Sequence, residues 1–266
     1  MGLCNFTTVL KLTIEITYYK ANATRGSRND TNHFFNQKGA LAMLSYYTPE
    51  TYEADIQRKM NNYWTVVPCL RVCLLPITYL DSQFVKCHPY RLLENTDLII
   101  AYYVKIDELM HNNDYRVIPV TNEMASTWRI SPEQLHADAM LHDRKKNYVV
   151  MDTSALAPQL EELPFPMYTV FSMQNDLPAE RGASGILHTN IRNYLHTLCP
   201  NGYYVLPSSI HELFVIPKVE DAEDVAGVIH SANRDLFGTA PEKSLDFLSN
   251  NLFEVDENDD LHMIVA

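Results

Sequence analysis

Tyr203-Tyr-Val-Leu-Pro-Ser-Ser-Ile-His-Glu-Leu-Phe-Val-Ile-Pro217 is the stretch of the chain that says most about its fold. Two apolar runs flank a Pro-Ser-Ser bend, and proline followed by serines favours a turn between two strands. We therefore expect a β-hairpin here. The bend also brings Ser208, Ser209, His211 and Glu212 close together in the sequence. The hairpin is therefore the first place to look for chemistry.

Amphipathic helices are predicted on both sides of this hairpin. Residues 184–198 carry apolar side chains at helical spacing, which makes one apolar stripe. Residues 221–237 begin with acidic side chains, which suit the positive end of a helix dipole, and end before Gly238. Strands are expected at three further places: 167–172, 252–255 and 261–265.

The N-terminal half mixes the same two kinds of signal. Residues 97–106 and 115–120 are apolar, β-rich runs joined by a polar segment, which most simply makes an antiparallel pair. Ser131-Pro132-Glu133-Gln134 has a capping hydroxyl, then proline and glutamine in the first turn, so a helix is predicted from Pro132 to about Leu141. Two elements are predicted nearer the N-terminus: a helix at 49–62 and a strand at 65–75 with Pro68 at an edge or bulge.

Together these elements predict an α+β fold. We expect antiparallel, β-rich sheets with helices packed on one face, and no continuous βαβ alternation. The chain divides into a divergent N-terminal segment with one strand and a polar loop, an N-terminal α+β half, a proline-containing connector, and a C-terminal α+β half with the hairpin. The boundaries of these four parts are 1–48, 49–142, 143–166 and 167–266.

The charge of the chain restricts its partners. The formal net charge is -12, which opposes binding to the phosphate backbone of nucleic acids. The densest basic run is Arg144-Lys145-Lys146, and no basic stripe extends from it. The sequence contains no apolar run of about 18 residues, the length that would predict a membrane span. The first ten residues also lack the basic start of a signal peptide. We expect a cytoplasmic protein that binds neither nucleic acid nor membrane.

The cysteines and histidines do not predict a metal site. Five cysteines without an export signal favour free thiols over disulfides. Cys69 and Cys73, followed by Cys87-His88, at first suggest a zinc site. However, the first two lie in an apolar run, and no second close pair completes a set of four ligands. His188 and His196 lie farther apart than the two histidines of His-Glu-x-x-His. We expect no metal and no cofactor.

The residues of the hairpin bend allow two interpretations. In the first, Ser208 or Ser209 is a nucleophile, His211 is its base and Glu212 orients the imidazole. Adjacent residues of a strand point to opposite faces, so Glu212 cannot orient His211 directly and a triad needs a carboxylate from elsewhere. No Gly-x-Ser-x-Gly motif exposes a nucleophile. In the second interpretation, the serines satisfy amides of the turn and the other two residues fix the strand.

Two other segments are candidates for ligand binding. Arg181, Gly182 and Gly185 precede a predicted helix, whose free amides would hold an anion beside the arginine. Glycines at such a place also serve close packing. Asn122 and Glu123 follow a strand and open a short helical segment, where an asparagine also caps a helix well. If this turn meets the hairpin in space, the two would form one polar cluster.

Several motifs follow one another from about Tyr90 onward: Asp97-Leu-Ile-Ile-Ala-Tyr-Tyr103, Val120-Thr-Asn-Glu123 with Trp128-Arg-Ile-Ser131, Tyr204-Val-Leu-Pro-Ser-Ser-Ile-His-Glu212, and Ala240-Pro-Glu242 with Asn251-Leu-Phe-Glu-Val-Asp256. Their order resembles a family of intracellular bacterial proteins, a domain of unknown function frequent in gram-positive gut bacteria and their mobile elements. Residues 1 to about 48 depart from the usual start of that family. The family has no assigned activity, so the resemblance implies no functional residue.

Without a complete catalytic motif, the sequence favours a non-enzymatic accessory protein, a protein-interaction or regulatory module. The acidic balance favours a partner protein with a basic surface, and the 16 tyrosines would supply anchors if several were exposed together. The alternative is a hydrolase or small-ligand-binding enzyme that uses Ser208 or Ser209 with His211 and Glu212 at the hairpin bend, residues 207–212. A role in mobile elements rests only on the resemblance.

Overall fold

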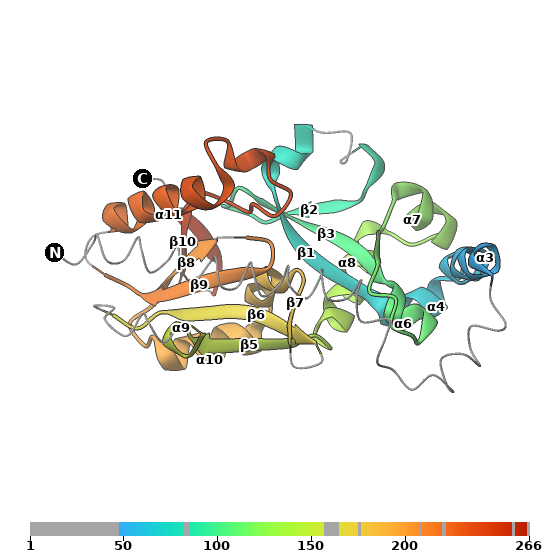
Figure 1. The fold of residues 1–266 in the computed structure, drawn as a ribbon, viewed down its shortest axis with the longest axis horizontal. Helices are drawn as coiled ribbons and strands as arrows, with labels where there is room; N and C mark the ends of the chain where they lie inside the picture. The colour runs from blue at the N-terminus through green and yellow to red at the C-terminus, as the bar shows by residue number, and fades with distance from the viewer. Residues whose placement is uncertain are drawn as a thin grey trace.

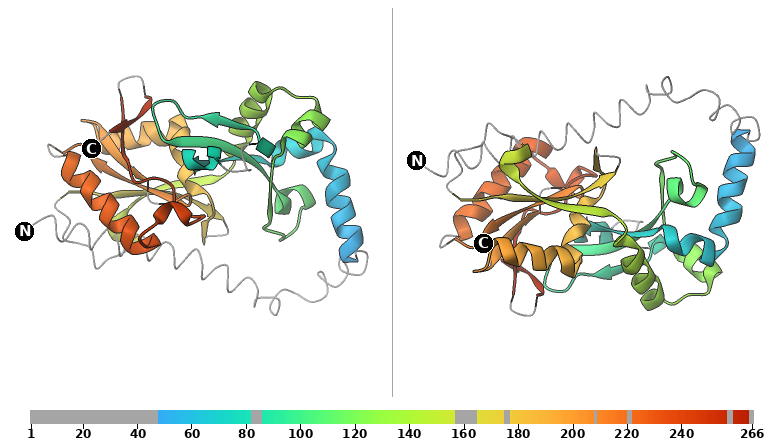
Figure 2. Two further views of the ribbon diagram at one scale, coloured as in Figure 1. Left: turned by 90° about the horizontal axis from the view of Figure 1, so that it is seen from above. Right: turned by 90° about the horizontal axis from the view of Figure 1, so that it is seen from below.

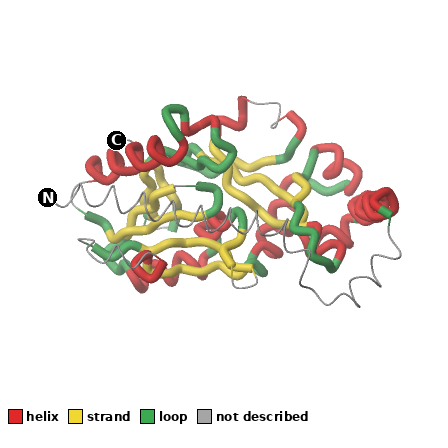
Figure 3. The backbone as a smooth tube through the Cα atoms, viewed as in Figure 1, coloured by secondary structure: helices red, strands yellow, loops and turns green. Residues whose placement is uncertain are grey.

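The structure is a computed structural model that describes residues 48–81, 86–156, 165–174, 177–207, 209–219, 222–256 and 259–264. Its strands form two antiparallel sheets next to each other, with helices around them (Figure 1 and Figure 3). The α+β class predicted from the sequence is confirmed. The strand and polar loop expected near the N-terminus lie outside the described residues, as does Ser208.

Four strands make the first sheet: β1 (Leu70–Pro76), β2 (Tyr90–Leu92), β3 (Leu98–Lys105) and β4 (Val117–Pro119). β3 lies in the middle. β1 pairs along one edge of β3, and β2 and β4 share the other edge. The antiparallel pairing of β3 with β4 confirms the pair that the two apolar runs and their polar connection predict. β1 and β3 are almost entirely buried, so this sheet belongs to the interior.

The strand predicted from Thr65 starts later in the structure. Two short helices, α4 (Tyr63–Val66) and η1 (Val67–Cys69), come first. Pro68 lies in the first turn of η1, where its missing N–H would have no helical acceptor in any case. The proline therefore marks a helical turn before the strand, where the sequence suggests an edge or a bulge.

Further helices pack around the first sheet: α3 (Pro49–Met60), η2 (Ile77–Asp81), α6 (Ile106–Met110), α7 (Asn122–Trp128) and α8 (Pro132–Asp143). The start of α8 is capped as predicted, because the Ser131 side chain accepts from the N–H of Gln134. α8 packs against β1 and buries Leu135 and Ala139. This packing places Asp143, the last residue of α8, beside β1.

Seven strands make the second sheet: β5 (Asn147–Asp152), β6 (Tyr168–Gln174), β7 (Leu177–Ala179), β8 (Tyr203–Pro207), β9 (Glu212–Pro217), β10 (Leu252–Val255) and β11 (Leu261–Ile264). Their order is β11-β10-β8-β9-β6-β5, with β7 beside β6. β8 and β9 form the predicted hairpin, with Val205 opposite Val215. β5 lies inside the predicted connector 143–166. The prolines that suggest a connector all come after this strand.

Alternating side chains of the hairpin contribute to two different cores. Tyr204 and Phe214 belong to a cluster with α11 (Ala222–Phe237), whereas Val205 and Val215 belong to a larger cluster that includes α10 (Thr189–Leu198). α10 and α11 accordingly lie on opposite sides of the second sheet (Figure 2). Two short helices complete the described elements: α9 (Thr153–Leu156) and η5 (Pro241–Lys243). None of the described helices is long and apolar enough to cross a membrane.

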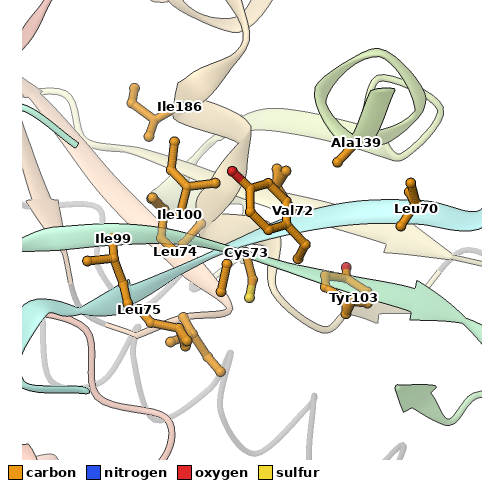
Figure 4. Close-up of a cluster of buried hydrophobic side chains, with 14 of the residues drawn as sticks. Leu70, Val72, Cys73, Leu74, Leu75, Ile99, Ile100, Tyr103, Ala139 and Ile186 are labelled. Carbon is orange, nitrogen blue, oxygen red and sulfur yellow. The ribbon is translucent and has the colours of Figure 1, made fainter. Parts of the chain in front are cut away.

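One core continues from the first sheet into the second. Between the sheets runs η4 (Gly182–Leu187), a 3-10 helix whose residues are almost all buried. Figure 4 shows Val72 and Leu74 of β1 together with Ala139 of α8 and Ile186 of η4, all members of this core. The helix predicted from Ser184 therefore begins as η4 and becomes α-helical only at Thr189. Because the core is shared, the two predicted halves pack as one unit.

Candidate functional site

The residues at the hairpin bend lie together, but they are not bonded as a catalytic triad. Ser209 Oγ donates to Glu212 Oε1 at 2.8 Å and accepts from the backbone N–H of His211 at 3.1 Å. His211 Nδ1 accepts from the backbone N–H of Arg181 at 3.2 Å, so Nε2 carries the proton that faces Asp246 Oδ1 at 3.1 Å. Both imidazole nitrogens have partners, and neither partner is the Ser209 hydroxyl. We call Ser209, His211, Glu212 and Asp246 the hairpin cluster.

The hairpin cluster fixes the bend to a distant segment. The N–H of Ile210 donates to the carbonyl of Asp246 at 2.9 Å, and Ser209 forms a bridge with Phe247. Burial raises the pKa of Glu212 above its ordinary value, and the nearby His211 and the Ser209 hydroxyl oppose that rise only in part. These contacts favour the second interpretation of the bend, in which its polar residues hold the strand in place.

The glycines next to Arg181 lie where the chain passes very close to its neighbours. A Cβ at Gly182 would lie 2.4 Å from the backbone N of Ser172 and 2.5 Å from the carbonyl O of His211. A Cβ at Gly185 would lie 2.8 Å from the ring of Tyr148. Protein atoms therefore fill the space that an anion would need beside these glycines. Close packing accounts for both glycines.

Asn122 and Glu123 have other neighbours than the hairpin. Asn122 Nδ2 donates to the carbonyl of Lys86 at 3.2 Å. Glu123 lines a groove of about 290 Å³, which Gln57 of α3 and Trp128 of α7 also line. Among the described residues, this turn and the hairpin do not form the common polar cluster that the sequence leaves open.

A second polar cluster lies at the junction of the two sheets. We define the junction cluster as Asp143, Lys146, Tyr148, Ser184 and His188. Asp143 Oδ2 accepts from the Tyr148 hydroxyl and lies 2.8 Å from His188 Nε2, while its Oδ1 lies 3.3 Å from Lys146 Nζ. Lys146 Nζ also donates to Ser184 Oγ at 3.4 Å. The cluster joins α8, β5, η4 and the start of α10.

The charges of the junction cluster balance one another. Burial acts to raise the pKa of Asp143, but Lys146 and the hydrogen bonds from His188 and Tyr148 outweigh it, and the pKa is lowered. Burial acts to lower the pKa of Lys146, but Asp143 outweighs it, and the pKa is raised. The cluster therefore holds a buried ion pair at neutral pH. The only sequence signal for it is the helical spacing of Asp143 and Lys146.

The backbone of Arg181 connects the two clusters. Its N–H donates to His211 in the hairpin cluster. Its carbonyl accepts from Lys146 Nζ at 3.2 Å and from Ser184 Oγ at 3.0 Å in the junction cluster. Arg181 adopts the left-handed conformation, with φ 58° and ψ 39°, at the start of η4. One residue thus faces both clusters with its main chain.

The basic run Arg144-Lys145-Lys146 separates two clefts. Lys145 lines a cleft of about 240 Å³ between the two sheets, which we call the inter-sheet cleft. Arg144 lines a cleft of about 480 Å³ at the start of α10, which we call the α10 cleft. Lys146 lines both. Neighbours in the sequence therefore serve different surfaces.

Side chains of both charges line the inter-sheet cleft, with an excess of cations. The cations are Lys105, Lys145, Lys146 and Arg181, and the carboxylates are Glu108 and Glu180. Lys105 lies 3.1 Å from Glu108 and Arg181 lies 2.8 Å from Glu180, whereas Lys145 has no ion pair within the described part of the chain. The cleft is also lined by Ser172, whose buried hydroxyl has no hydrogen-bond partner among the described residues.

The part of the chain that the structure describes contains no candidate metal site, because no three His, Cys, Asp or Glu side chains there lie close enough together to hold a metal ion. Cys69, Cys73 and Cys199 are buried free thiols, and Cys87 is exposed. Burial raises the pKa of Cys69 to about 11, so this thiol stays protonated at neutral pH.

The comparisons with known proteins identify a family and no activity. No curated protein and no solved structure matches the chain significantly. Residues 78–254 match the "Family of unknown function (DUF5688)", and this segment contains all residues of the hairpin cluster and of the junction cluster. The resemblance to a domain of unknown function is confirmed, while its bacterial source and its mobile elements stay predictions. Since the match spans more than half of the chain, the protein belongs to the DUF5688 family.

Proposed function

We propose that the protein is a non-enzymatic binding module that holds carboxylate groups of its partner in the inter-sheet cleft. The observation that carries this proposal is the gathering of Lys105, Lys145, Lys146 and Arg181 around one cleft of a chain with a net charge of -12. They come from β3, from the turn after α8 and from the residue before η4. The fold, and not the composition, brings them together.

The non-enzymatic part of the proposal is supported by the bonding of the serines. In neither cluster does a described serine hydroxyl bond to an imidazole nitrogen. Ser209 donates to Glu212, and Ser184 Oγ lies 2.8 Å from the Tyr148 hydroxyl and 3.0 Å from the carbonyl of Arg181. A serine nucleophile needs a base within hydrogen-bond reach. The contacts therefore give the hydrolase alternative no support.

The local charge of the cleft changes the kind of partner expected. The net charge of the chain favours a partner with a basic surface. In the cleft, three of the four cations have a carboxylate partner and Lys145 has no ion pair among the described residues, so this place favours an acidic group. Tyr90 and Tyr194 are the only exposed tyrosines among the described residues, so a group of tyrosine anchors finds no support there. We propose that the acidic group belongs to another protein or to a small dicarboxylate.

Isothermal titration calorimetry with a hexaglutamate peptide and with glutarate tests this proposal. Lys145→Ala removes an exposed cation without an ion pair in the described part, and we expect it to weaken binding about tenfold, the effect of losing one charged hydrogen bond. Lys243→Ala is the matched control, since it removes an exposed lysine of η5 that does not line the cleft.

The outcomes separate the possible partners. Binding of the peptide alone supports a protein partner, and binding of glutarate supports a small ligand, provided that Lys145→Ala weakens either one more than Lys243→Ala does. Absence of binding by both probes, or equal effects of the two substitutions, contradicts the proposal.

A further inference from the structure

The second sheet ends in a strand whose outer edge is unpaired among the described residues. β5 pairs with β6 and with no other described strand, and it lies at the lower margin of the sheet in Figure 1. Its four central residues, 148–151, are all partly exposed, whereas Val170 and Phe171 of β6 are buried. The described part of the fold therefore leaves one side of β5 unused.

The register of β5 with β6 tells which of its backbone groups point outward. The N–H of Thr153, just after β5, donates to the carbonyl of Met167, just before β6. Hydrogen-bonded residues alternate along an antiparallel strand, so every second residue before Thr153 also faces β6. The N–H and carbonyl groups of Val150 and Asp152 then point away from the sheet. None of these four groups has a hydrogen-bond partner among the described residues.

The other outer strands of the described sheets are either covered or shorter. In β1, the N–H of Val72 donates to Asp143 Oδ1 at 3.2 Å and its carbonyl accepts from Ser184 Oγ at 3.3 Å. β11 has four residues, and the N–H of Met263 donates to the carbonyl of Asn95. β2 and β4 have three residues each. Long edge strands commonly carry lysine or proline, which prevents further pairing, but the six residues of β5 include neither.

The two ends of β5 differ in charge. At its start, Asn147 lines the inter-sheet cleft together with Lys145, an exposed cation without an ion pair in the described part of the chain. At its end stands Asp152, an exposed carboxylate. In an antiparallel pair, the C-terminal end of an added strand lies beside the start of β5. A strand with acidic residues at its C-terminal end therefore matches the charges of this edge.

We propose that the outer edge of β5 binds an extended segment of a partner protein as an additional antiparallel strand, whose acidic C-terminal end lies in the inter-sheet cleft. The acidic end rests on the proposed function, to which this inference adds the form of the partner. Six residues of β5 span about 20 Å, which a segment of six or seven residues covers. The backbone groups of Val150 and Asp152 supply hydrogen bonds, and Lys145 sets the direction of the segment.

Amide hydrogen exchange of the full chain, followed by NMR, tests the edge directly. In the free protein we expect the N–H groups of Val150 and Asp152 to exchange at least about tenfold faster than those of Val149 and Met151, which face β6. The probe is the peptide Thr-Val-Thr-Val-Thr-Glu-Glu, blocked at both ends and made of residues that favour strands, with acidic residues at the end that reaches the cleft. At saturation it should slow exchange at Val150 and Asp152 at least about tenfold.

Modified peptides test the hydrogen bonds and the direction without changing the protein. N-methylation of the third residue, which lies opposite Val150, removes an N–H that faces β5, whereas N-methylation of the fourth removes one that faces away. We expect the first to weaken binding at least about tenfold and the second to leave it within about threefold. The peptide Glu-Glu-Thr-Val-Thr-Val-Thr places its acidic end beside Asp152 and should also bind about tenfold more weakly.

The experiment separates this inference from the proposed function. Lys145→Ala should weaken the peptide more than the control Lys243→Ala does, because only Lys145 lines the cleft. Binding of glutarate without slower exchange at Val150 in the presence of the peptide overturns the inference and leaves the proposed function intact. Slower exchange at Val150 with equal effects of the two substitutions supports the added strand and contradicts the carboxylate site.

Three further results would overturn the inference. The first is slow exchange at Val150 and Asp152 in the free protein at every concentration, which would mean that the chain itself covers the edge. The second is exchange at these residues that slows as the concentration of the free protein rises, which would assign the edge to a second copy of the chain. The third is equal weakening by the two N-methylations, which would mean that no backbone pairing occurs.

Discussion

Asp143 and Glu212 are both buried carboxylates, one in each cluster, and their surroundings differ in the donors that they meet. Asp143 meets Lys146, His188, the Tyr148 hydroxyl and the N–H of Val72. Glu212 accepts from the Ser209 hydroxyl. The donors around Asp143 lower its pKa in spite of burial, whereas burial raises the pKa of Glu212. Burial alone therefore does not decide whether a carboxylate stays charged, because the number and charge of its donors decide it.

The largest difference between the clusters is expected from removal of their aspartates. Asp143→Ala leaves Lys146 buried without its counter-charge, which costs about 3–5 kcal/mol of unfolding free energy. Asp246→Ala removes the partner of His211, but its carboxylate is 15% exposed, so water replaces part of what is lost and we expect a cost of about 1 kcal/mol. Urea unfolding measures both. Equal costs would mean that the two clusters contribute alike.

The connection between the clusters is tested at Gly182. Gly182→Ala pushes a methyl group against the backbone of Ser172 and His211, and we expect a loss of about 3 kcal/mol of unfolding free energy, because backbone atoms have little room to move.

Gly227→Ala is the matched control for that substitution. Gly227 lies within α11, and a Cβ there meets no atom within 4 Å, so alanine stabilises the helix by up to about 1 kcal/mol. A mild effect of Gly182→Ala in thermal unfolding would show that η4 can move away from β6 and β9.

The smallest and most specific effect is a difference in pH dependence. The folded pKa of Glu212 is raised, so its ionisation opposes folding, and the relative stability of Glu212→Gln increases as pH rises above the ordinary carboxyl pKa. The folded pKa of Asp143 is lowered, so its stabilising contribution is present at neutral pH and is lost as pH falls through that folded pKa.

Thermal unfolding of the wild type, Glu212→Gln and Asp143→Asn between about pH 2 and pH 8 measures both trends, because the loss at Asp143 falls below its ordinary pKa. We expect Glu212→Gln to gain on the wild type toward pH 8 and Asp143→Asn to lose most there. If the stability of the two variants relative to the wild type changed with pH in the same way, the opposite pKa shifts of Asp143 and Glu212 would be contradicted.

Local patterns in the sequence predict much of the fold. The cap at Ser131 predicts α8, and the two apolar runs around the Pro-Ser-Ser bend predict β8 and β9. The 3-10 geometry of η4 and its start at Gly182 were not predicted, because they depend on the close approach of Gly182 to β6 and β9, which are distant in the sequence. Tertiary contacts of this kind leave little trace in local periodicity.

The candidate functional residues were also predicted only where they are neighbours in the sequence. The hairpin cluster was found because Ser209, His211 and Glu212 are neighbours in the sequence, although their partner Asp246 was not. The junction cluster was missed because its members lie between residues 143 and 188 in four elements. The charge of the inter-sheet cleft was also hidden, because a net charge averages over the whole chain and says nothing about where cations gather.

The main chain of Arg181 makes the two clusters thermodynamically dependent on each other. Its N–H is bonded on one side to His211 and its carbonyl on the other to Lys146 and Ser184. The N–H and the carbonyl belong to the two peptide groups on either side of the Arg181 Cα, so local opening of either cluster releases the backbone of a residue that the other cluster also holds. Residues from β5 to the segment around Asp246 should then unfold locally as one cooperative unit, and the two clusters should not open independently of each other.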